Sequence, residues 1–335
     1  MSTQAEVYHL LRPRPYPAKL SLVFPTYNEE AALPFLRAAV TDFLGGLRCA
    51  AEIILVNDGS TDATLTRAVE WAEADPRVKV IHLSRNFGHQ LAATAGLDYA
   101  TGDAIVLLDA DLQDPLPVIH EMLERYCQGY DVVYAQRAAR AGETVFKRLS
   151  AWVFYRLMRA LVDRRLPVDA GDFRLLSREC LDGLRRMREQ HRFLRGMVAW
   201  VGYPQCAVKY RRGPRIAGRS KYPVGKMLTF AWTAATSFST LPLKIGIVLG
   251  LLAGLLGVEE FIRALVALWA GRVVPGWTSL MVITCILCSA LLVCIGIVGQ
   301  YVGQIYEESK GRPLYLVART FNVPSSEQPA TGGRA

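Results

Sequence analysis

The residues with the clearest capacity for chemistry form an acidic motif directly after a short apolar run. Ala104 to Leu108 is unbroken, apolar and rich in strand-forming residues, as is typical of a buried strand in a mostly parallel sheet. Asp109-Ala110-Asp111 follows, with Gln113 two residues further on. Two carboxylates and an amide oxygen are hard donors that suit Mg²⁺ or Mn²⁺ held against a diphosphate. A turn that caps the next helix would contain the same acidic residues, so the neighbouring motifs must decide.

Three earlier apolar runs end in polar segments in the same way. Leu20 to Phe24 leads into PTYNEE, Ile53 to Val56 leads into NDGSTD, and Val78 to Leu83 leads into SRNFGHQ. A strand, a polar loop and a helix repeated four times predict a doubly wound α/β sheet. We therefore expect all four polar loops at one edge of the sheet, where open α/β sheets bind their ligands.

The side chains expected at that edge suit a nucleotide. Tyr27 offers a ring to stack on a base, Glu29 offers an acceptor for ribose hydroxyls, and Asp58 offers one for a base imide or ribose. Each residue alone also fits a turn or a helix cap, but together they favour a nucleotide site. No G-x-G-x-x-G or P-loop follows these strands, so a dinucleotide site and ATP-driven chemistry lose support.

Composition and charge restrict the class of partner. The 335 residues are 51% hydrophobic and 21% charged, enough for one large domain and a further region. The net charge is +9, and the basic residues concentrate between Arg137 and Lys226. The chain has no RNP-like, zinc-finger or basic-zipper pattern, so we expect no nucleic-acid partner. Seven cysteines without a disulfide framework and no apolar signal segment at the N-terminus suit a reducing compartment.

Two apolar segments near the C-terminus predict membrane helices. Leu280 to Val298 carries no charge and is long enough to cross a hydrocarbon core of roughly 30 Å. Ile245 to Val258 is also uncharged, but charged residues interrupt it before the apolar run resumes, so a buried soluble helix would fit as well. Basic residues precede the first segment and follow the second. The positive-inside rule thus predicts two spans, at about 245–270 and 278–302, with both ends cytoplasmic.

Two other segments predict contacts with the membrane surface. Residues 145–166 alternate apolar and basic side chains, as does a helix that lies among lipid headgroups, although a surface helix of a soluble domain has a similar pattern. Residues 223–241 are aromatic-rich and predict a juxtamembrane helix. The expected organisation is an N-terminal tail (1–19), a catalytic domain (20–222), the juxtamembrane helix, a two-helix membrane region (242–306) and a cytoplasmic C-terminal tail (307–335).

Four motifs together resemble a known enzyme family. PTYNEE, VNDGSTD, LSRNFGHQ and LDADLQDP, in this order and spacing, resemble the family-2 glycosyltransferases of the GT-A fold, and more narrowly the polyprenyl-phosphate glycosyltransferases. The resemblance covers nearly the whole chain. It implies a Rossmann-like catalytic domain that transfers a sugar, with inversion, from a UDP- or GDP-sugar to undecaprenyl or dolichyl phosphate. It also implies Mg²⁺ or Mn²⁺ at the leaving diphosphate and a location at the cytoplasmic face of the inner membrane.

The resemblance also implies roles for individual residues. The metal would be held by Asp109, Asp111 and Gln113, and the nucleotide sugar would be bound by Pro25, Tyr27, Glu29, Val56, Asp58, Asp109, Ala110 and Arg137. Asp172 belongs to an expected loop, 169–172, where family-2 enzymes place a catalytic carboxylate. The phosphates would be bound by Arg219, Ser220 and Lys221, from a loop that closes over the donor, and by Arg174 and Arg195. The implied catalytic set is Asp111, Asp172 and Arg219.

Two alternatives to a polyprenyl-phosphate transferase stay open at this point. A processive polysaccharide synthase would carry Q-x-x-R-W, which the segment from Gln190 to Leu194 does not match. A non-catalytic sensor of nucleotide sugars, or a scaffold for a lipid flippase, would show no metal-dependent donor turnover. A general base is not required, because an acceptor phosphate with a second pKa of about 6 is largely anionic already. Glu259 and Glu260, near the outer part of the first span, are consistent with contacts in a homo-oligomer or with a functional polar site.

Overall fold

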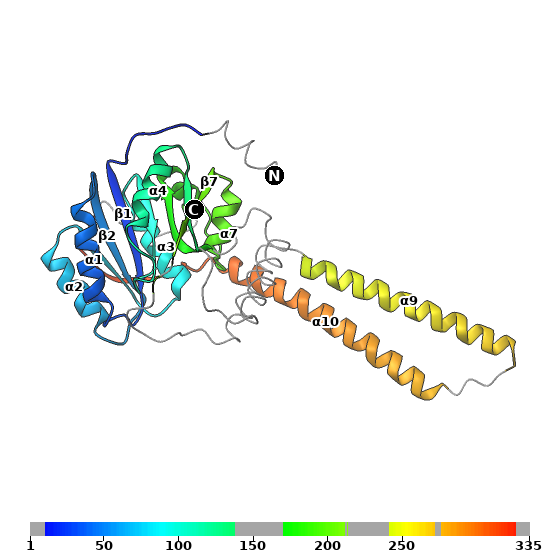
Figure 1. Cartoon of the computed structure of the whole chain (residues 1–335). Coiled ribbons are helices and arrows are strands. Elements are labelled where there is room, and N and C mark those ends of the chain that lie inside the picture. Colours follow the sequence, from blue (N-terminus) through cyan, green and yellow to red (C-terminus); the bar gives the residue numbers. More distant parts are fainter. Residues whose placement is uncertain (1–10, 138–169, 212, 214–240, 272–275, 326–335) are drawn as a thin grey trace. The chain divides into compact units, whose positions relative to one another are not determined.

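The chain forms two compact units, each described here by itself (Figure 1). The computed structural model describes residues 11–137, 170–211, 213, 241–271 and 276–325. The first unit comprises Met1–Pro223 together with Arg312–Ala335, and the second comprises Val224–Gly311. The predicted surface helix at 145–166 lies outside the described residues. The predicted juxtamembrane helix at 223–241 does so too, apart from Leu241, the first residue of a long helix.

The first unit is built on an eight-stranded sheet with the order β7-β5-β6-β4-β1-β2-β3-β8. Four parallel strands lie in the middle of the sheet: β1 (Lys19–Thr26), β2 (Ala50–Asn57), β3 (Val78–Leu83) and β4 (Ala104–Leu107). On one side follow β6 (Ala170–Ser177), antiparallel to β4, then β5 (Val132–Arg137) and β7 (Gln205–Tyr210). The predicted mostly parallel α/β sheet is confirmed.

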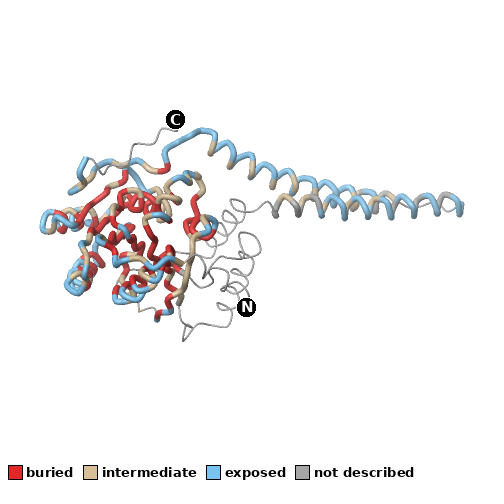
Figure 2. Tube along the Cα trace, turned by 90° about the horizontal axis from the view of Figure 1, so that it is seen from above, coloured by how far each residue is buried: buried red, intermediate tan, exposed pale blue. Residues whose placement is uncertain are grey.

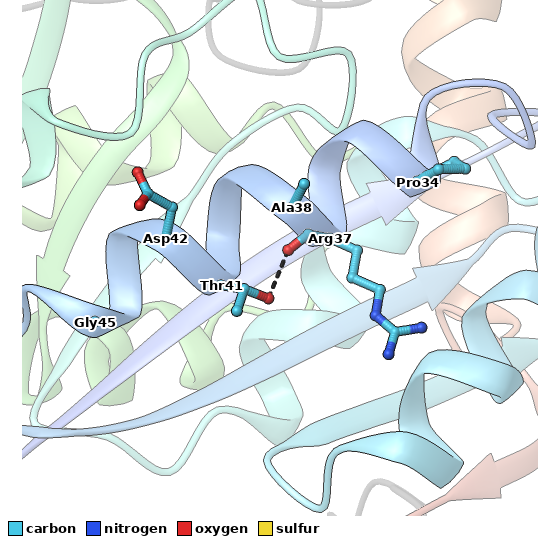
Figure 3. A pocket seen from close by; sticks show the side chains of 6 residues that line it. All are labelled: Pro34, Arg37, Ala38, Thr41, Asp42 and Gly45. Carbon is cyan, nitrogen blue, oxygen red and sulfur yellow. Dashed lines mark hydrogen bonds between the residues drawn. The ribbon is translucent and has the colours of Figure 1, made fainter.

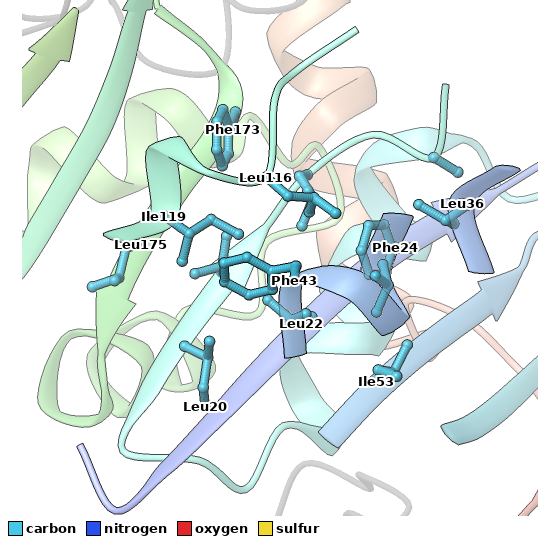
Figure 4. Close-up of a cluster of buried hydrophobic side chains, with 14 of the residues drawn as sticks. Leu20, Leu22, Phe24, Leu36, Phe43, Ile53, Leu116, Ile119, Phe173 and Leu175 are labelled. Atoms are coloured by element: carbon cyan, nitrogen blue, oxygen red, sulfur yellow. The ribbon is translucent and has the colours of Figure 1, made fainter. Parts of the chain in front are cut away.

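Helices cover both faces of this sheet. Leu22 and Phe24 of β1 point into a cluster that includes buried side chains of α1 (Leu33–Gly45), α2 (Thr64–Ala74) and α4 (Val118–Cys127) (Figure 4). Side chains alternate along a strand, so Val23 points to the opposite face. There α3 (His89–Tyr99) approaches the sheet at Gly96, where a Cβ atom would lie 2.3 Å from Val23 Cγ1. A glycine is needed for α3 to pack this closely.

The first unit ends with a strand that the sequence analysis did not expect. β8 (Val317–Phe321) lies in the segment assigned to a C-terminal tail, and it pairs antiparallel with the edge strand β3. Two hydrogen bonds from the same segment support it. Tyr315 Oη donates to Asp98 Oδ2 at 2.8 Å, and Asn322 Nδ2 donates to Val78 O at 3.0 Å. The segment therefore covers an otherwise open edge of the sheet and belongs structurally to the first unit.

The second unit is a pair of long helices, α9 (Leu241–Trp269) and α10 (Trp277–Ser309). Cys294 Sγ of α10 lies 3.6 Å from the carbonyl oxygen of Gly246 in α9. The described side chains on both helices are mostly exposed (Figure 2). Within the described residues, one segment, Ile286–Ser309, is long and apolar enough to cross a membrane, with a mean hydropathy of 2.1 over an 18-residue window. Both predicted spans are helical, and the crossing of the membrane by two of them stays a prediction.

Candidate active site

The parallel strands bring the predicted site residues to one edge of the sheet. Asp109 follows the end of β4, and Tyr27 and Asp58 follow the ends of β1 and β2. The antiparallel strand β6 adds a residue from elsewhere in the chain. Leu107 is the partner of Arg174, so continuing the register places Asp172 opposite Asp109. Asp172 was expected in a loop, and the structure places it instead on this strand, beside the acidic motif.

Asp172 is the centre of a polar cluster formed by three elements. The Arg195 guanidinium, from α7 (Leu194–Val201), approaches both carboxylate oxygens, with Nε 2.8 Å from Oδ1 and Nη2 3.3 Å from Oδ2. From the first turn of α3, His89 Nε2 lies 3.3 Å from Asp172 Oδ2 and 3.6 Å from Asp109 Oδ1. Gln90 Nε2 donates to the same Asp172 oxygen at 3.5 Å. His89 thus lies between two carboxylates that the sequence analysis placed in the site.

The surroundings lower the pKa of the Asp172 carboxyl group and raise the pKa of the Asp109 carboxyl group. Burial alone would raise the pKa of Asp172, but Arg195 and His89 outweigh it and hold that pKa well below its usual range. Burial lowers the pKa of His89, yet the hydrogen bond to Asp172 and the charge of Asp109 outweigh burial and raise it to about 9. Burial raises the pKa of Asp109, and the charges of Asp172 and Asp111 raise it further. Among the described residues, the positive charges of Arg195 and His89 balance the negative charge of Asp172. The charge of Asp109 is balanced less well, since His89 is opposed there by neighbouring carboxylates.

The acidic motif is held by contacts with its own loop and with the end of β7. Asp111 is 7% exposed, and its Oδ1 accepts a hydrogen bond from the Gln113 backbone N–H at 3.2 Å. Tyr210, the last residue of β7, donates its hydroxyl to Asp114 Oδ1, and the Gly213 N–H donates to the Gln113 carbonyl at 2.9 Å. These contacts connect the acidic loop to its own backbone and to the end of β7.

These residues fit a divalent cation. Within the described part of the chain, no three His, Cys, Asp or Glu side chains form a metal-binding group. A site made of two carboxylates, the Gln113 amide oxygen and the oxygens of a bound diphosphate does not need a third such residue. The raised pKa of Asp109 fits a hard cation as well, because a positive charge would relieve the repulsion from Asp111 and Asp172. Metal binding by Asp109, Asp111 and Gln113 remains a prediction.

The predicted nucleotide residues differ in accessibility. Tyr27 is 36% exposed and Glu29 is partly buried, whereas Pro25, Val56 and Ala110 are buried. Asp58 is 2% exposed, and its two oxygens accept hydrogen bonds from the backbone N–H groups of Phe87 (2.7 Å) and Gly88 (2.9 Å). Asp58 therefore holds the loop that leads into α3, a structural contact that the sequence analysis did not predict.

The predicted phosphate-binding residues also separate into groups. Arg174 is 4% exposed and donates to the Gly171 carbonyl at 2.9 Å, and burial lowers its pKa to about 10. The Arg174 guanidinium therefore contacts its own strand, and phosphate binding by Arg174 stays a prediction. Arg195 is more accessible, with 29% of its side chain exposed. Arg219, Ser220 and Lys221 lie outside the described residues, as does the side chain of Arg137, the last residue of β5.

Two residues of the cluster received no role from the sequence. His89 and Gln90 belong to the quoted SRNFGHQ segment, and their position at the start of a helix after a strand end was the available signal. A shallow hollow elsewhere, lined by Pro34 to Gly45 on one side of α1, contains none of the predicted site residues (Figure 3). We therefore centre the candidate site on the carboxyl edge of the sheet.

Comparison with known proteins identifies the family. The glycosyl transferase family 2 profile matches residues 21–185. A Bacillus subtilis protein named uncharacterized glycosyltransferase YkcC is 44% identical over 304 residues, 90% of this chain and 94% of that protein. A protein of Escherichia coli K12 named prophage bactoprenol glucosyl transferase homolog is 38% identical over 305 residues, 90% of this chain and 99% of that protein. The solved structure of a mannosyltransferase from Pyrobaculum calidifontis is similar over 85% of this chain and 89% of its own, but only at 15% identity and a TM-score of 0.41. The sequence relatives, alike along nearly their whole length, show that this chain belongs to glycosyl transferase family 2 and is a glycosyltransferase.

Proposed function

We propose that the protein transfers a sugar from a nucleotide-diphosphate sugar to a polyprenyl phosphate at the cytoplasmic face of a membrane. One observation carries this proposal: the relative named a bactoprenol glucosyl transferase homolog is 38% identical over 90% of this chain. Residues 21–185 alone match the general family, so the similarity extends well beyond the catalytic core. The polyprenyl phosphate acceptor is therefore inferred from similarity along nearly the whole chain. The nucleotide-sugar donor is inferred from the residues at the carboxyl edge of the sheet.

The geometry supports the proposed chemistry at the carboxyl edge of the sheet. A phosphate oxygen of the acceptor would attack the anomeric carbon while the bond to the nucleoside diphosphate breaks, which inverts the configuration at that carbon. A divalent cation held by Asp109, Asp111 and Gln113 would supply positive charge for the leaving diphosphate. Tyr27 and Glu29 would position the nucleoside, and Arg195 would lie near the acceptor phosphate. The acceptor is already anionic, so the protein contributes position and charge rather than proton removal.

The exposed apolar helices support a membrane location. Leu251, Leu255 and Leu292 are each more than half exposed, and Trp269 is 93% exposed. Apolar surface on this scale is unfavourable in water and indicates contact with lipid or another protein. We propose that α9 and α10 both span the inner membrane, with the catalytic unit and β8 in the cytoplasm. Glu259 and Arg263 of α9 form an ion pair at 3.4 Å. This pairing lowers the free-energy cost of placing charged side chains in the first membrane span.

Donor turnover tests the proposed reaction. The full chain, purified in detergent with undecaprenyl phosphate and Mg²⁺ or Mn²⁺, is offered a panel of UDP- and GDP-sugars while released nucleotide is measured. We expect release with one donor that requires both the lipid and the metal, and the anomeric configuration of the lipid product is read by NMR. Asp111→Ala should abolish release, whereas Asp42→Ala, an exposed acid on α1, should not. Nucleotide binding without turnover by any donor would contradict the proposal.

Labelling tests the proposed topology. Single cysteines are placed, in a cysteine-free background, in the turn after α9 and in the segment that contains β8. Two spans predict that a membrane-impermeant thiol reagent labels only the turn in intact cells and labels both positions after lysis. Labelling of the β8 segment in intact cells would contradict two spans.

A further inference from the structure

We propose that Asp172 is a positioning residue that holds Arg195 and His89 toward the reacting groups, and that it does not act as a general base. This inference rests on the proposed function, because the group that Arg195 meets is taken to be the acceptor phosphate. It concerns how the carboxyl edge of the sheet is assembled from β6, α3 and α7.

Both oxygens of Asp172 are already engaged by donors of the chain. Oδ1 accepts from Arg195 Nε at 2.8 Å, and Oδ2 faces Arg195 Nη2 and His89 Nε2, both at 3.3 Å. Asp172 is also buried, with 9% of the residue exposed to solvent. A general base must present a free lone pair to the proton that it removes. Asp172 instead offers its lone pairs to neighbouring cations, and its arrangement with Arg195 is the two-point geometry that orients a guanidinium.

Gln90 connects the parts of this arrangement. Its Oε1 accepts a hydrogen bond from the Leu194 backbone N–H at 3.0 Å, one of the N–H groups that a helix leaves without an internal partner. Its Nε2 donates to Asp172 Oδ2 at 3.5 Å. One side chain thus joins the start of α3, the start of α7 and the carboxylate on β6. Arg195 is the next residue after Leu194. The hydrogen bond from Leu194 to Gln90 therefore also fixes the backbone position from which the Arg195 side chain extends.

Two partners of Asp172, Arg195 and His89, are the parts of the cluster that a ligand can reach, whereas a third, Arg174, lies buried 3.8 Å from Asp172 Oδ1. The Arg195 side chain is 29% exposed and the His89 side chain is 31% exposed, compared with 9% for Asp172. His89 also faces Asp109, at 3.6 Å, on the side of the predicted metal. A substrate therefore meets the cations while the carboxylate lies behind them. Removing Asp172 should affect the reaction through Arg195 and His89 rather than through a separate proton transfer.

A double-mutant cycle tests this directly. The full chain in detergent is compared with Asp172→Asn, Arg195→Gln and the double variant, using kcat, KM and Kd for undecaprenyl phosphate at saturating donor. Asparagine keeps the shape of aspartate but turns an N–H₂ group toward one of the donors. Two residues that act as one unit give non-additive effects. We expect each single variant to lower kcat/KM by about 10- to 100-fold, mainly through a higher KM. The kcat/KM of the double variant should equal that of the more impaired single variant.

The opposite pattern overturns the inference. If Asp172 is an independent base, the losses in kcat/KM of Asp172→Asn and Arg195→Gln multiply in the double variant. In Asp172→Asn, kcat then falls with KM unchanged, and the acidic limb of the pH profile of kcat disappears. Should Asp172→Asn fail to fold, Gln90→Leu replaces it in the cycle, with a smaller expected loss that vanishes in the Arg195→Gln background. Glu121→Gln and Arg125→Gln, an exposed pair on α4, form the control cycle and should change nothing. The binding cycle needs no turnover, so a wild-type protein that binds the lipid without transferring sugar overturns the proposed function and still tests the inference.

Discussion

Two carboxylates at opposite ends of the parallel sheet, the buried Glu52 and the half-buried Asp109, have opposite surroundings. Glu52 lies near the start of β2, at the amino edge, and Asp109 follows the end of β4, at the carboxyl edge. Glu52 accepts hydrogen bonds from Lys79 Nζ at 2.7 Å and from Ser21 Oγ at 2.5 Å, and Lys19 Nζ lies 2.8 Å away. Burial alone would raise the pKa of Glu52, but the two lysines and Ser21 outweigh it and lower the pKa to about 2.

Among the residues that the structure describes, Asp109 has no comparable set of partners. Its pKa is raised by burial and by neighbouring carboxylates, and only His89 opposes the rise. A buried charge that the chain neutralises itself contributes to the fold, whereas one that stays under-compensated suits a ligand that brings the missing charge. The difference between the two carboxylates therefore separates a structural position from a functional one.

Removing the charge of Asp109 should break activity and leave the fold intact. We expect Asp109→Asn to lower sugar transfer by about 10³-fold, because the cation that stabilises the leaving diphosphate loses a ligand. The thermal midpoint of the metal-free protein should stay equal or rise, since a repelled charge has been removed. Transfer assays and thermal unfolding of the same preparation check both parts. A large fall in the midpoint would place Asp109 in the same class as Glu52.

Removing the charge of Glu52 should do the reverse. We expect Glu52→Gln to lower the free energy of unfolding by about 3–5 kcal/mol, because the buried Lys79 loses the opposite charge of Glu52. The kcat of the molecules that remain folded should be nearly unchanged. Denaturant unfolding of the full chain in detergent measures the loss, and Glu70→Gln, an exposed glutamate on α2, is the matched control. A loss of kcat without a loss of stability would contradict the comparison.

Acid should affect the two edges with opposite signs. The folded pKa of Glu52 is about 2, below the unfolded value of about 4.3, so its contribution is present above pH 4.3 and is lost as the pH falls toward 2. This contribution is on the order of 3 kcal/mol. The raised pKa of Asp109 means that protonating it relieves repulsion and adds stability. Thermal midpoints from pH 7 to pH 3 should fall less steeply in Glu52→Gln, and more steeply in Asp109→Asn, than in the wild type.

A divalent cation should stabilise only the carboxyl edge. At a Mn²⁺ concentration of about 100 times Kd, binding adds about 2.7 kcal/mol to stability. We expect Mn²⁺ to raise the thermal midpoint of the wild type and of Glu52→Gln, but not that of Asp109→Asn. Sodium chloride at the same ionic strength serves as the control, because Na⁺ does not replace a divalent cation at paired carboxylates. An equal rise in all three proteins would contradict a metal site at Asp109.

A third carboxylate should give the smallest effect. Asp98, at the end of α3, accepts from Arg188 Nη1 at 2.8 Å and from Tyr315 Oη at 2.8 Å, so the chain satisfies it as it does Glu52. Tyr315→Phe removes one of these hydrogen bonds and should cost about 1 kcal/mol of stability with no change in kcat. Tyr306→Phe, on the exposed surface of α10, is the control. A change in kcat would indicate that the C-terminal segment affects the site.

Much of this protein follows from local patterns in its sequence. Apolar runs of four to eight residues that end in polar loops predicted the four parallel strands, and those strand ends placed Asp109, Asp58 and Tyr27 at one edge. Both long apolar segments are helical, as their composition predicted. Patterns of this kind can be read because the period of a strand or helix, and the end of an apolar run, depend on neighbouring residues alone.

The tertiary structure decided which distant residues meet. β6 pairs antiparallel with β4 and thereby moves Asp172 from an expected loop to a position beside Asp109. His89 and Arg195, 106 positions apart, converge on it, and β8 returns from the end of the chain to pair with β3. No local pattern specifies these contacts, because strand register and the choice of edge depend on packing between segments that are far apart in sequence. The family and the acidic edge were readable from the sequence, while the polar cluster that completes the site exists only in the folded chain.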